Sequence, residues 1–182
     1  MRDQMTRFLP LFLFAAMALL FAVMLTDEER NPKQIKSALI GKAAPSVSLK
    51  PLYEGQKGID TEDFQISKPI VVNFFASWCI PCRAEHDNLM KLAAMNKITL
   101  YGIAHKDKPQ DSRKFLDQLG NPYDRIGVDL DGFQASIDFG ISGVPETFII
   151  NGKGIITYRH WGPIIGDQLT TEVLPAIEEA FK

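Results

Sequence analysis

The sequence predicts an α/β domain in which helices flank a mixed central sheet, preceded by one transmembrane helix. Three observations lead to this fold class. The first is an uncharged run of eighteen residues from Phe8 to Leu25, about the minimum length for a helix that spans a bilayer. The second is the alternation, after residue 41, of short apolar segments with segments of helical periodicity. The third is the turn sequence Asn151-Gly152-Lys153-Gly154 between two strand-like segments, which is typical of a β-hairpin.

The N-terminal residues 1–25 are interpreted as an uncleaved membrane anchor, followed by a linker at residues 26–40. A cleavable signal peptide is the competing interpretation, because Arg2 and Arg7 precede the apolar run as a basic n-region would. The run ends in Val23-Met24-Leu25 without the small residues of a cleavage site, which favours the anchor. More Lys and Arg residues follow the run than precede it, so the positive-inside count does not give the orientation.

Residues 41–182 form one predicted domain, long enough to bury a core of its own. The almost wholly apolar residues 70–76 predict a central strand buried on both faces. A helix should begin near Cys79 and end before a second strand at residues 98–103. The remaining elements expected are a helix over 112–119, a strand over 125–128, a helix over 132–139, hairpin strands over 147–150 and 155–160, and a last helix over 167–181 that Pro175 bends.

Charge and cysteine content exclude several classes of function. The formal net charge is -2, and no run of Lys or Arg occurs, so nucleic acid is not expected as a partner. The chain has two cysteines, Cys79 and Cys82. Because they lie three positions apart, they cannot staple a fold as the dispersed cysteines of small secreted proteins do. They therefore serve redox chemistry or bind a metal.

The sequence Trp78-Cys79-Ile80-Pro81-Cys82 lies where the buried strand ends and a helix begins. A helix N-terminus offers unpaired N–H groups and the positive end of the helix dipole, both of which favour a thiolate. We expect Cys79 to be the exposed nucleophile and Cys82 to attack the mixed disulfide that Cys79 forms. A structural zinc site is the alternative. It would need further ligands, for which the candidates are His86, His105 and His160, without a second cysteine pair.

Three longer blocks carry a family resemblance. They are Val72-Asn73-Phe74-Phe75-Ala76-Ser77-Trp78-Cys79-Ile80-Pro81-Cys82-Arg83-Ala84-Glu85-His86, then Gly120-Asn121-Pro122-Tyr123, and then Gly143-Val144-Pro145-Glu146-Thr147-Phe148. With these blocks in this order, the chain resembles the thioredoxin-like, membrane-anchored proteins of cytochrome c maturation called DsbE or CcmG. The resemblance covers nearly the whole chain. One departure is Ala104-His105, where the family has an Asn followed by an aromatic residue.

The resemblance implies a thioredoxin fold with an added N-terminal hairpin and a central insertion. It also implies a periplasmic domain on the inner membrane that reduces the haem-binding cysteines of apocytochrome c. The implied partners are apocytochrome c, a membrane electron donor of the DsbD or CcdA kind, and the cytochrome c maturation machinery. No cofactor and no bound metal are expected. An oxidase or isomerase of the same fold is a further alternative, because the sequence does not give the reduction potential.

The resemblance also implies roles for individual residues. It makes Val144–Pro145 a cis peptide bond opposite the cysteines, exposing the backbone of Val144 to an extended substrate, while Trp78 shapes the same groove. Ordinary thioredoxins carry a buried Asp at the position of Asn73, and Asn cannot accept a proton. Glu85 and Glu146 are the acidic alternatives, and a carboxylate beside a thiol opposes thiolate formation.

His86 follows Cys82 by four residues and so lies on the same helical face. This spacing leaves a Cys and His copper site conceivable, although the set of ligands is incomplete. The alternative function, from a different class, is therefore a thioredoxin-like copper metallochaperone or a module that holds apocytochrome. The competing interpretation of His86 is an ordinary histidine on the surface of a helix.

Overall fold

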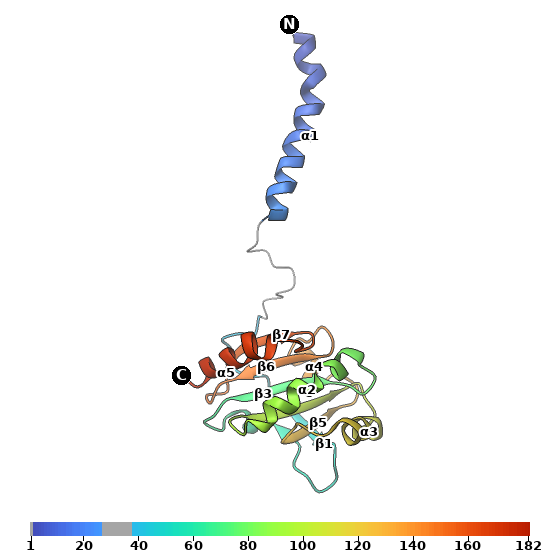
Figure 1. The fold of residues 1–182 in the computed structure, drawn as a ribbon, viewed down its shortest axis with the longest axis vertical. Helices are drawn as coiled ribbons and strands as arrows, with labels where there is room; N and C mark the ends of the chain where they lie inside the picture. The colour runs from blue at the N-terminus through green and yellow to red at the C-terminus, as the bar shows by residue number, and fades with distance from the viewer. Residues whose placement is uncertain (1, 27–37) are drawn as a thin grey trace. The chain divides into compact units, whose positions relative to one another are not determined.

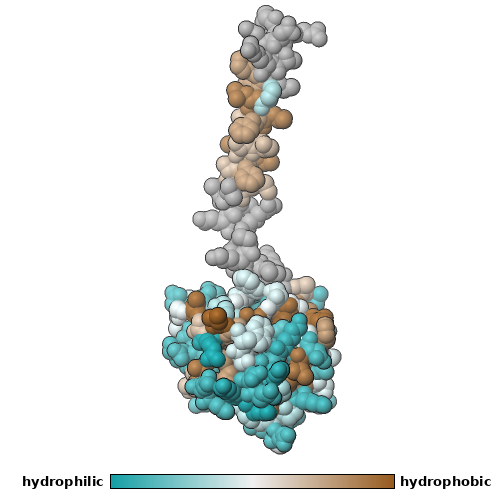
Figure 2. Space-filling model, turned by 90° about the vertical axis from the view of Figure 1, so that its right-hand side faces the viewer, coloured by the Kyte–Doolittle hydropathy of each residue, from teal (hydrophilic) through white to brown (hydrophobic). Residues whose placement is uncertain are grey.

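The computed structural model describes residues 2–26 and 38–182, which fall into two units, Met1–Ile35 and Lys36–Lys182. In the first unit, helix α1 (Arg2–Thr26) contains Pro10. Its described atoms are mostly hydrophobic (Figure 2). Within the described part of the chain, no helix has the length and apolar character needed to cross a membrane, so the predicted transmembrane helix at residues 1–25 is not supported. Most of the predicted linker at residues 26–40 lies outside the described residues.

The second unit is built on a mixed seven-stranded sheet of order β2-β1-β5-β4-β3-β6-β7 (Figure 1). Strands β3 and β4 are parallel, as are β4 and β5, whereas β6 runs antiparallel to both β3 and β7. The strands are β1 (Ser48–Pro51), β2 (Ile59–Asp60), β3 (Ile70–Phe75), β4 (Thr99–His105), β5 (Arg125–Asp129), β6 (Glu146–Ile150) and β7 (Ile156–Trp161). The antiparallel pair β1 and β2 forms the N-terminal hairpin that the resemblance implies.

The helices are α2 (Ile80–Ala94), α3 (Pro109–Leu119), α4 (Ala135–Asp138) and α5 (Leu174–Ala180), with a 3-10 turn at Thr61–Phe64 and a π-helical segment at Leu169–Val173. Two predictions differ from this arrangement. The helix expected over 132–139 is confined to the four residues of α4, since positive-φ glycines at 132 and 140 bound it. The helix expected over 167–181 begins as the π-helical segment, and Pro175 lies in the first turn of α5, where proline is tolerated, instead of bending a longer helix.

Strand β3 separates two cores because its side chains alternate between the faces of the sheet. Val71 and Phe75 join the core that packs under α2, α3 and α5, while Val72 and Phe74 join the core that includes Phe139 after α4. All six residues of β3 are buried, as expected for a strand covered on both faces. Packing on both faces therefore fixes the position of the end of β3, and the cysteine pair follows this end in the chain.

Candidate active site

Cys79 and Cys82 are joined by a disulfide with an S–S distance of 2.10 Å. Cys79 is the N-cap of α2, and the backbone N–H of Cys82 donates a hydrogen bond to Cys79 Sγ over 3.1 Å. Pro81 occupies the first turn of α2, where its missing N–H leaves no bond unmade. After reduction the same N–H and the positive end of the helix face the Cys79 sulfur, so both stabilise a thiolate there.

The prediction that Cys79 is exposed is wrong for this oxidised state. Cys79 is 3% exposed and Cys82 is 2% exposed. The carbonyl oxygen of Val144 lies 3.4 Å from Cys79 Sγ and covers it from the opposite loop. The exposed residues are the neighbours Trp78 and Ile80, at 58% and 80%. An incoming disulfide therefore meets an apolar rim before it reaches the sulfur.

The loop opposite the cysteines contains the cis Val144–Pro145 peptide bond, as the resemblance implies. In the disulfide state Cys79 Sγ carries no proton, so its approach to the Val144 carbonyl is a contact. In the reduced state a Cys79 thiol would donate a hydrogen bond to that carbonyl. This arrangement places the backbone of Val144 next to the reacting sulfur.

Glu146 stabilises this loop from behind. Its side chain is fully buried and accepts hydrogen bonds from Ser142 N and Ser142 Oγ, each over 2.7 Å, and from Gly143 N over 3.3 Å. It also pairs with Arg159 from β7 over 2.6 Å, and both side chains are buried. The structure therefore compensates the charge of Glu146 with a cation and ties it to the loop that carries Val144.

Glu85 lies in the core one helical turn after Cys82, on the same side of α2. Its carboxylate accepts hydrogen bonds from Asn73 Nδ2 over 2.9 Å and from Ile164 N over 3.0 Å, and no cation from residues 2–26 or 38–182 pairs with it. Burial raises the pKa of Glu85 to about 7, although these two hydrogen bonds act in the opposite direction. Its ionisation therefore falls near neutral pH.

Asn73 connects Glu85 to two other buried side chains. Its carbonyl oxygen accepts a hydrogen bond from Tyr123 Oη over 2.7 Å, and its amide also donates to Thr147 Oγ1 over 3.0 Å. Burial, with a further contribution from Glu85, raises the pKa of Tyr123 well above its usual value, so its hydroxyl remains a donor. Asn73 thus links Tyr123 and Thr147 to Glu85 through buried hydrogen bonds.

Asp107 is a site residue that sequence reasoning missed. Its buried carboxylate accepts hydrogen bonds from Ser77 N over 2.7 Å, Ser77 Oγ over 2.8 Å and Ser112 Oγ over 2.6 Å. Nearby, Trp78 Nε1 donates to the carbonyl of Lys106 over 3.1 Å. The segment after β4 therefore holds the loop that leads into Cys79. The available signal was an acidic residue just past the end of a parallel strand, where sites of α/β proteins gather.

The three histidines do not join the cysteines. His86 Nε2 lies 3.0 Å from the carbonyl oxygen of Gly120, and its ring packs edge-on against Phe115. Burial lowers the pKa of His86 and of His105. His160 pairs with Glu172 over 3.4 Å. Among residues 2–26 and 38–182, no group of three or more His, Cys, Asp or Glu side chains is arranged to hold a metal ion.

Comparison with known proteins agrees with this geometry. The family model described as Redoxin matches residues 39–174. The chain is 44% identical over 159 residues to the thiol:disulfide interchange protein DsbE of Pasteurella multocida, covering 86% of each chain. It is 40% identical over 172 residues to the thiol:disulfide interchange protein HelX of Rhodobacter capsulatus, covering 93% of this chain and 94% of HelX. The crystal structure of a putative DsbE from Chlorobium tepidum superposes with a TM-score of 0.63 at 21% identity, covering 79% of this chain and 98% of that one, which supports the thioredoxin-like fold.

Proposed function

The chain belongs to the Redoxin family as a DsbE-type thiol:disulfide oxidoreductase, and from this premise we propose that it reduces the haem-binding disulfide of apocytochrome c. The observation that carries the proposal is the Cys79–Cys82 disulfide at the N-terminus of α2, opposite a cis Val144–Pro145 bond. A dithiol in this position passes two electrons to a substrate disulfide and becomes a disulfide itself.

The exchange takes two steps. In the first, the Cys79 thiolate attacks one sulfur of the substrate disulfide, a mixed disulfide forms, and the other substrate sulfur leaves as a thiolate that takes up a proton. In the second, Cys82 loses its proton and attacks Cys79 Sγ. The Cys79–Cys82 bond closes, and the second substrate thiolate leaves. The enzyme is oxidised by two electrons and the substrate is reduced by two.

Glu85 is proposed to accept the proton that Cys82 loses. It lies one turn from Cys82 on α2, and burial raises its pKa to about 7. A base whose pKa is close to the working pH is ionised in a large fraction of molecules and still binds a proton readily. Asn73, which cannot accept a proton, positions the carboxylate through the hydrogen bond to Oε1.

The loop from Ser142 to Pro145 is proposed to bind the substrate backbone. Val144 offers its peptide edge beside Cys79, and an extended peptide that pairs with it brings a cysteine to the sulfur with little dependence on side chains. Glu146 holds this loop through its hydrogen bonds to Ser142 and Gly143. Trp78 and Ile80 form the exposed apolar rim of the same groove.

The proposed substrate is supported by the similarity to thiol:disulfide interchange proteins and by the compartment that such chemistry needs. Haem attachment uses a Cys-x-x-Cys-His sequence whose two thiols must be free. A bacterial periplasm is kept oxidising and would close that pair, so a reductant is required there. We place the domain in the periplasm and supply its electrons from a membrane reductase of the DsbD or CcdA kind, as part of the cytochrome c maturation machinery. Attachment to the inner membrane stays a prediction from residues 8–25 that the described helices do not support.

The test uses the full chain and an oxidised peptide that contains Cys-x-x-Cys-His. Equilibration of the enzyme with glutathione and with dithiothreitol gives its reduction potential, and a stopped-flow measurement gives the rate at which the reduced enzyme opens the peptide disulfide. A reductase has a potential low enough to leave the peptide reduced at equilibrium. An enzyme that instead closes the reduced peptide is an oxidase, and the proposal is then wrong.

A further inference from the structure

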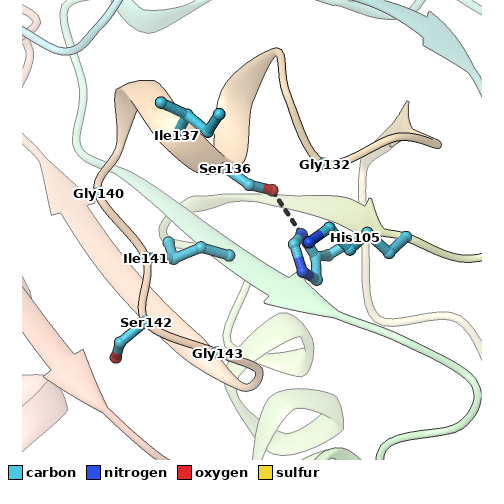
Figure 3. A pocket seen from close by; sticks show the side chains of 9 residues that line it. His105, Gly132, Ser136, Ile137, Gly140, Ile141, Ser142 and Gly143 are labelled. Carbon is cyan, nitrogen blue, oxygen red and sulfur yellow. Dashed lines mark hydrogen bonds between the residues drawn. The ribbon is translucent and has the colours of Figure 1, made fainter.

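A cavity of about 380 Å³ lies between the end of β4, helix α4 and the loop before Pro145. His105, Ser136, Ile137 and Ile141 are among the residues that line it (Figure 3). Its volume falls in the range of small-molecule and side-chain sites. The mechanism above assigns it no role.

The cavity shares two walls with the proposed substrate groove. Ser142 and Gly143 line it and directly precede Val144, whose carbonyl oxygen is 3.4 Å from Cys79 Sγ. Lys106 also lines it, and its carbonyl oxygen accepts the hydrogen bond from Trp78. A peptide paired with Val144 therefore runs close to the cavity. The residue next to its reacting cysteine lies about 3.3 Å further along the strand, and its side chain leaves the strand on the face opposite to the cysteine side chain.

The hydrogen bonds of His105 fix its tautomer. Its Nδ1 is 2.6 Å from Ser136 Oγ, and these two atoms face each other in Figure 3. The Ser136 hydroxyl donates to Asp129 Oδ2 over 2.7 Å, and that carboxylate also accepts the backbone N–H groups of Ser136 and Gln134. Because the single hydroxyl proton goes to Asp129, Nδ1 must donate to Ser136 Oγ. Nε2 of the neutral ring is therefore an acceptor.

This acceptor has no partner within the described part of the chain, although His105 is only 8% exposed. Burial lowers the pKa of His105 and Lys106 lowers it further, against a smaller opposing effect of Asp129, which favours the neutral ring. A complementary ligand has an N–H or O–H donor and an apolar part for Ile137 and Ile141. Lys106 at the wall disfavours a cationic ligand.

We propose that this cavity is a specificity subsite for the histidine that follows the second cysteine of a Cys-x-x-Cys-His substrate, with His105 Nε2 accepting the N–H of the substrate imidazole. The assignment rests on the proposed function and adds to it a reason why this class of disulfide is preferred. A neutral imidazole supplies the donor, lacks the permanent charge of Lys or Arg, and is next in sequence to a cysteine that Cys79 attacks. His105 acts on the substrate through recognition and takes no part in electron transfer.

The test compares oxidised peptides that end in Cys-x-x-Cys-His, Cys-x-x-Cys-Ala or Cys-x-x-Cys-Lys as substrates of the reduced full chain. The wild type should reduce the His peptide about five-fold faster than the Ala peptide, the size expected for one hydrogen bond in a partly dry site, and should not favour the Lys peptide. His105→Phe should bring the ratio of His to Ala rates to about one. Ser136→Ala, which keeps the imidazole but frees its tautomer, should lower the same ratio part of the way.

Phe133→Ala is the matched control, because Phe133 is exposed on the same segment and does not line the cavity. It should keep the ratio of the wild type. A ratio that is unchanged in both His105→Phe and Ser136→Ala, while the wild type reduces all three peptides, overturns the subsite and leaves the reductase assignment standing. A wild type that reduces none of the peptides overturns both.

Discussion

The amide of Asn73 donates a hydrogen bond over 2.9 Å to the carboxylate of Glu85, and both residues are fully buried. Asn73 belongs to β3, which leads into the cysteine pair, and Glu85 belongs to α2, which leads out of it. The bond therefore joins the two elements that position Cys79 and Cys82. It also holds in place a carboxylate whose pKa is about 7, one helical turn after Cys82.

Glu85→Gln should remove a pH dependence of stability. Burial raises the pKa of Glu85 from 4.5 to about 7. An acid with a raised folded pKa holds more protons in the folded state than in the unfolded state between these values. The folded state therefore loses stability as the pH rises from about 4.5 to about 7. The loss is of the order of 3 kcal/mol at 1.36 kcal/mol per pH unit. Denaturant unfolding at pH 5 and pH 8 measures it.

The matched control for this experiment is Glu178→Gln, because Glu178 is exposed on α5. This variant should keep the pH dependence of the wild type. Glu85→Gln should also carry a constant penalty of about 1–3 kcal/mol, because its amide group faces one of the two donors, Asn73 or Ile164. Equal slopes in the wild type and in Glu85→Gln would contradict the assignment of a raised pKa to this carboxyl.

Glu146→Gln should destabilise the domain by about 3–5 kcal/mol, because it leaves the buried Arg159 without its anionic partner. The sequence alone predicts instead that this substitution favours the thiolate by removing a nearby negative charge. Arg159 compensates that charge, so we expect the larger effect on unfolding and the smaller one on thiol reactivity. Thermal unfolding and alkylation of the reduced protein measure the two effects. Glu172→Gln removes a partly exposed carboxylate that faces the buried His160, and it should change stability by less than about 1 kcal/mol.

Asp107→Asn should slow disulfide exchange and should also lower the stability of the fold. The amide loses one acceptor oxygen among the bonds to Ser77 N, Ser77 Oγ and Ser112 Oγ. A stability loss of about 1–3 kcal/mol is expected for a donor left unpaired. Because Ser77 precedes Trp78 and Cys79, the rate of peptide reduction should fall as the loop loses its position. Asp117→Asn, on the exposed side of α3, should leave both quantities unchanged, and equal effects of the two variants would argue against a positioning role for Asp107.

The sequence predicted the parts of the site that lie in one stretch of chain. The apolar run of β3 followed by Cys79 and Cys82 was sufficient to place the dithiol at a helix N-terminus, because both signals are local. The pairing of Glu146 with Arg159 was not predictable, since it depends on the register of β6 and β7. The pair of His105 and Ser136 likewise joins residues that are 31 positions apart.

The burial of Cys79 also depends on a contact between residues that are far apart in the chain. Its place before the helix predicted an exposed sulfur, but its cover comes from Val144, which is 65 positions away in the chain. A local pattern gives the direction of a side chain and does not give what packs over it. The resemblance supplied the cis bond at Pro145, which composition alone would not favour.

Cys82→Ser should trap a mixed disulfide between Cys79 and its substrate. Without the Cys82 sulfur, the enzyme cannot resolve the adduct itself, because the chain has no cysteine other than Cys79 and Cys82. Cys79→Ser should trap nothing, since Cys79 is the N-cap sulfur that accepts the backbone N–H of residue 82, whereas Cys82 lies within the first turn of α2. Non-reducing electrophoresis and mass spectrometry of the trapped species, from cells that make cytochrome c, identify the partner, and apocytochrome c should be prominent among the adducts.

The reactivity of the remaining thiol in each variant tests which cysteine is the nucleophile. In Cys82→Ser, the N–H of residue 82 can still donate to the Cys79 sulfur, because this donor belongs to the backbone. The remaining thiol of Cys82→Ser should therefore react with iodoacetamide at pH 7 faster than an ordinary thiol does. The thiol of Cys79→Ser should react more slowly than the same reference. Adducts that form through Cys82 instead would reverse the roles of the two sulfurs, and the absence of thiol adducts in both variants would remove the exchange mechanism.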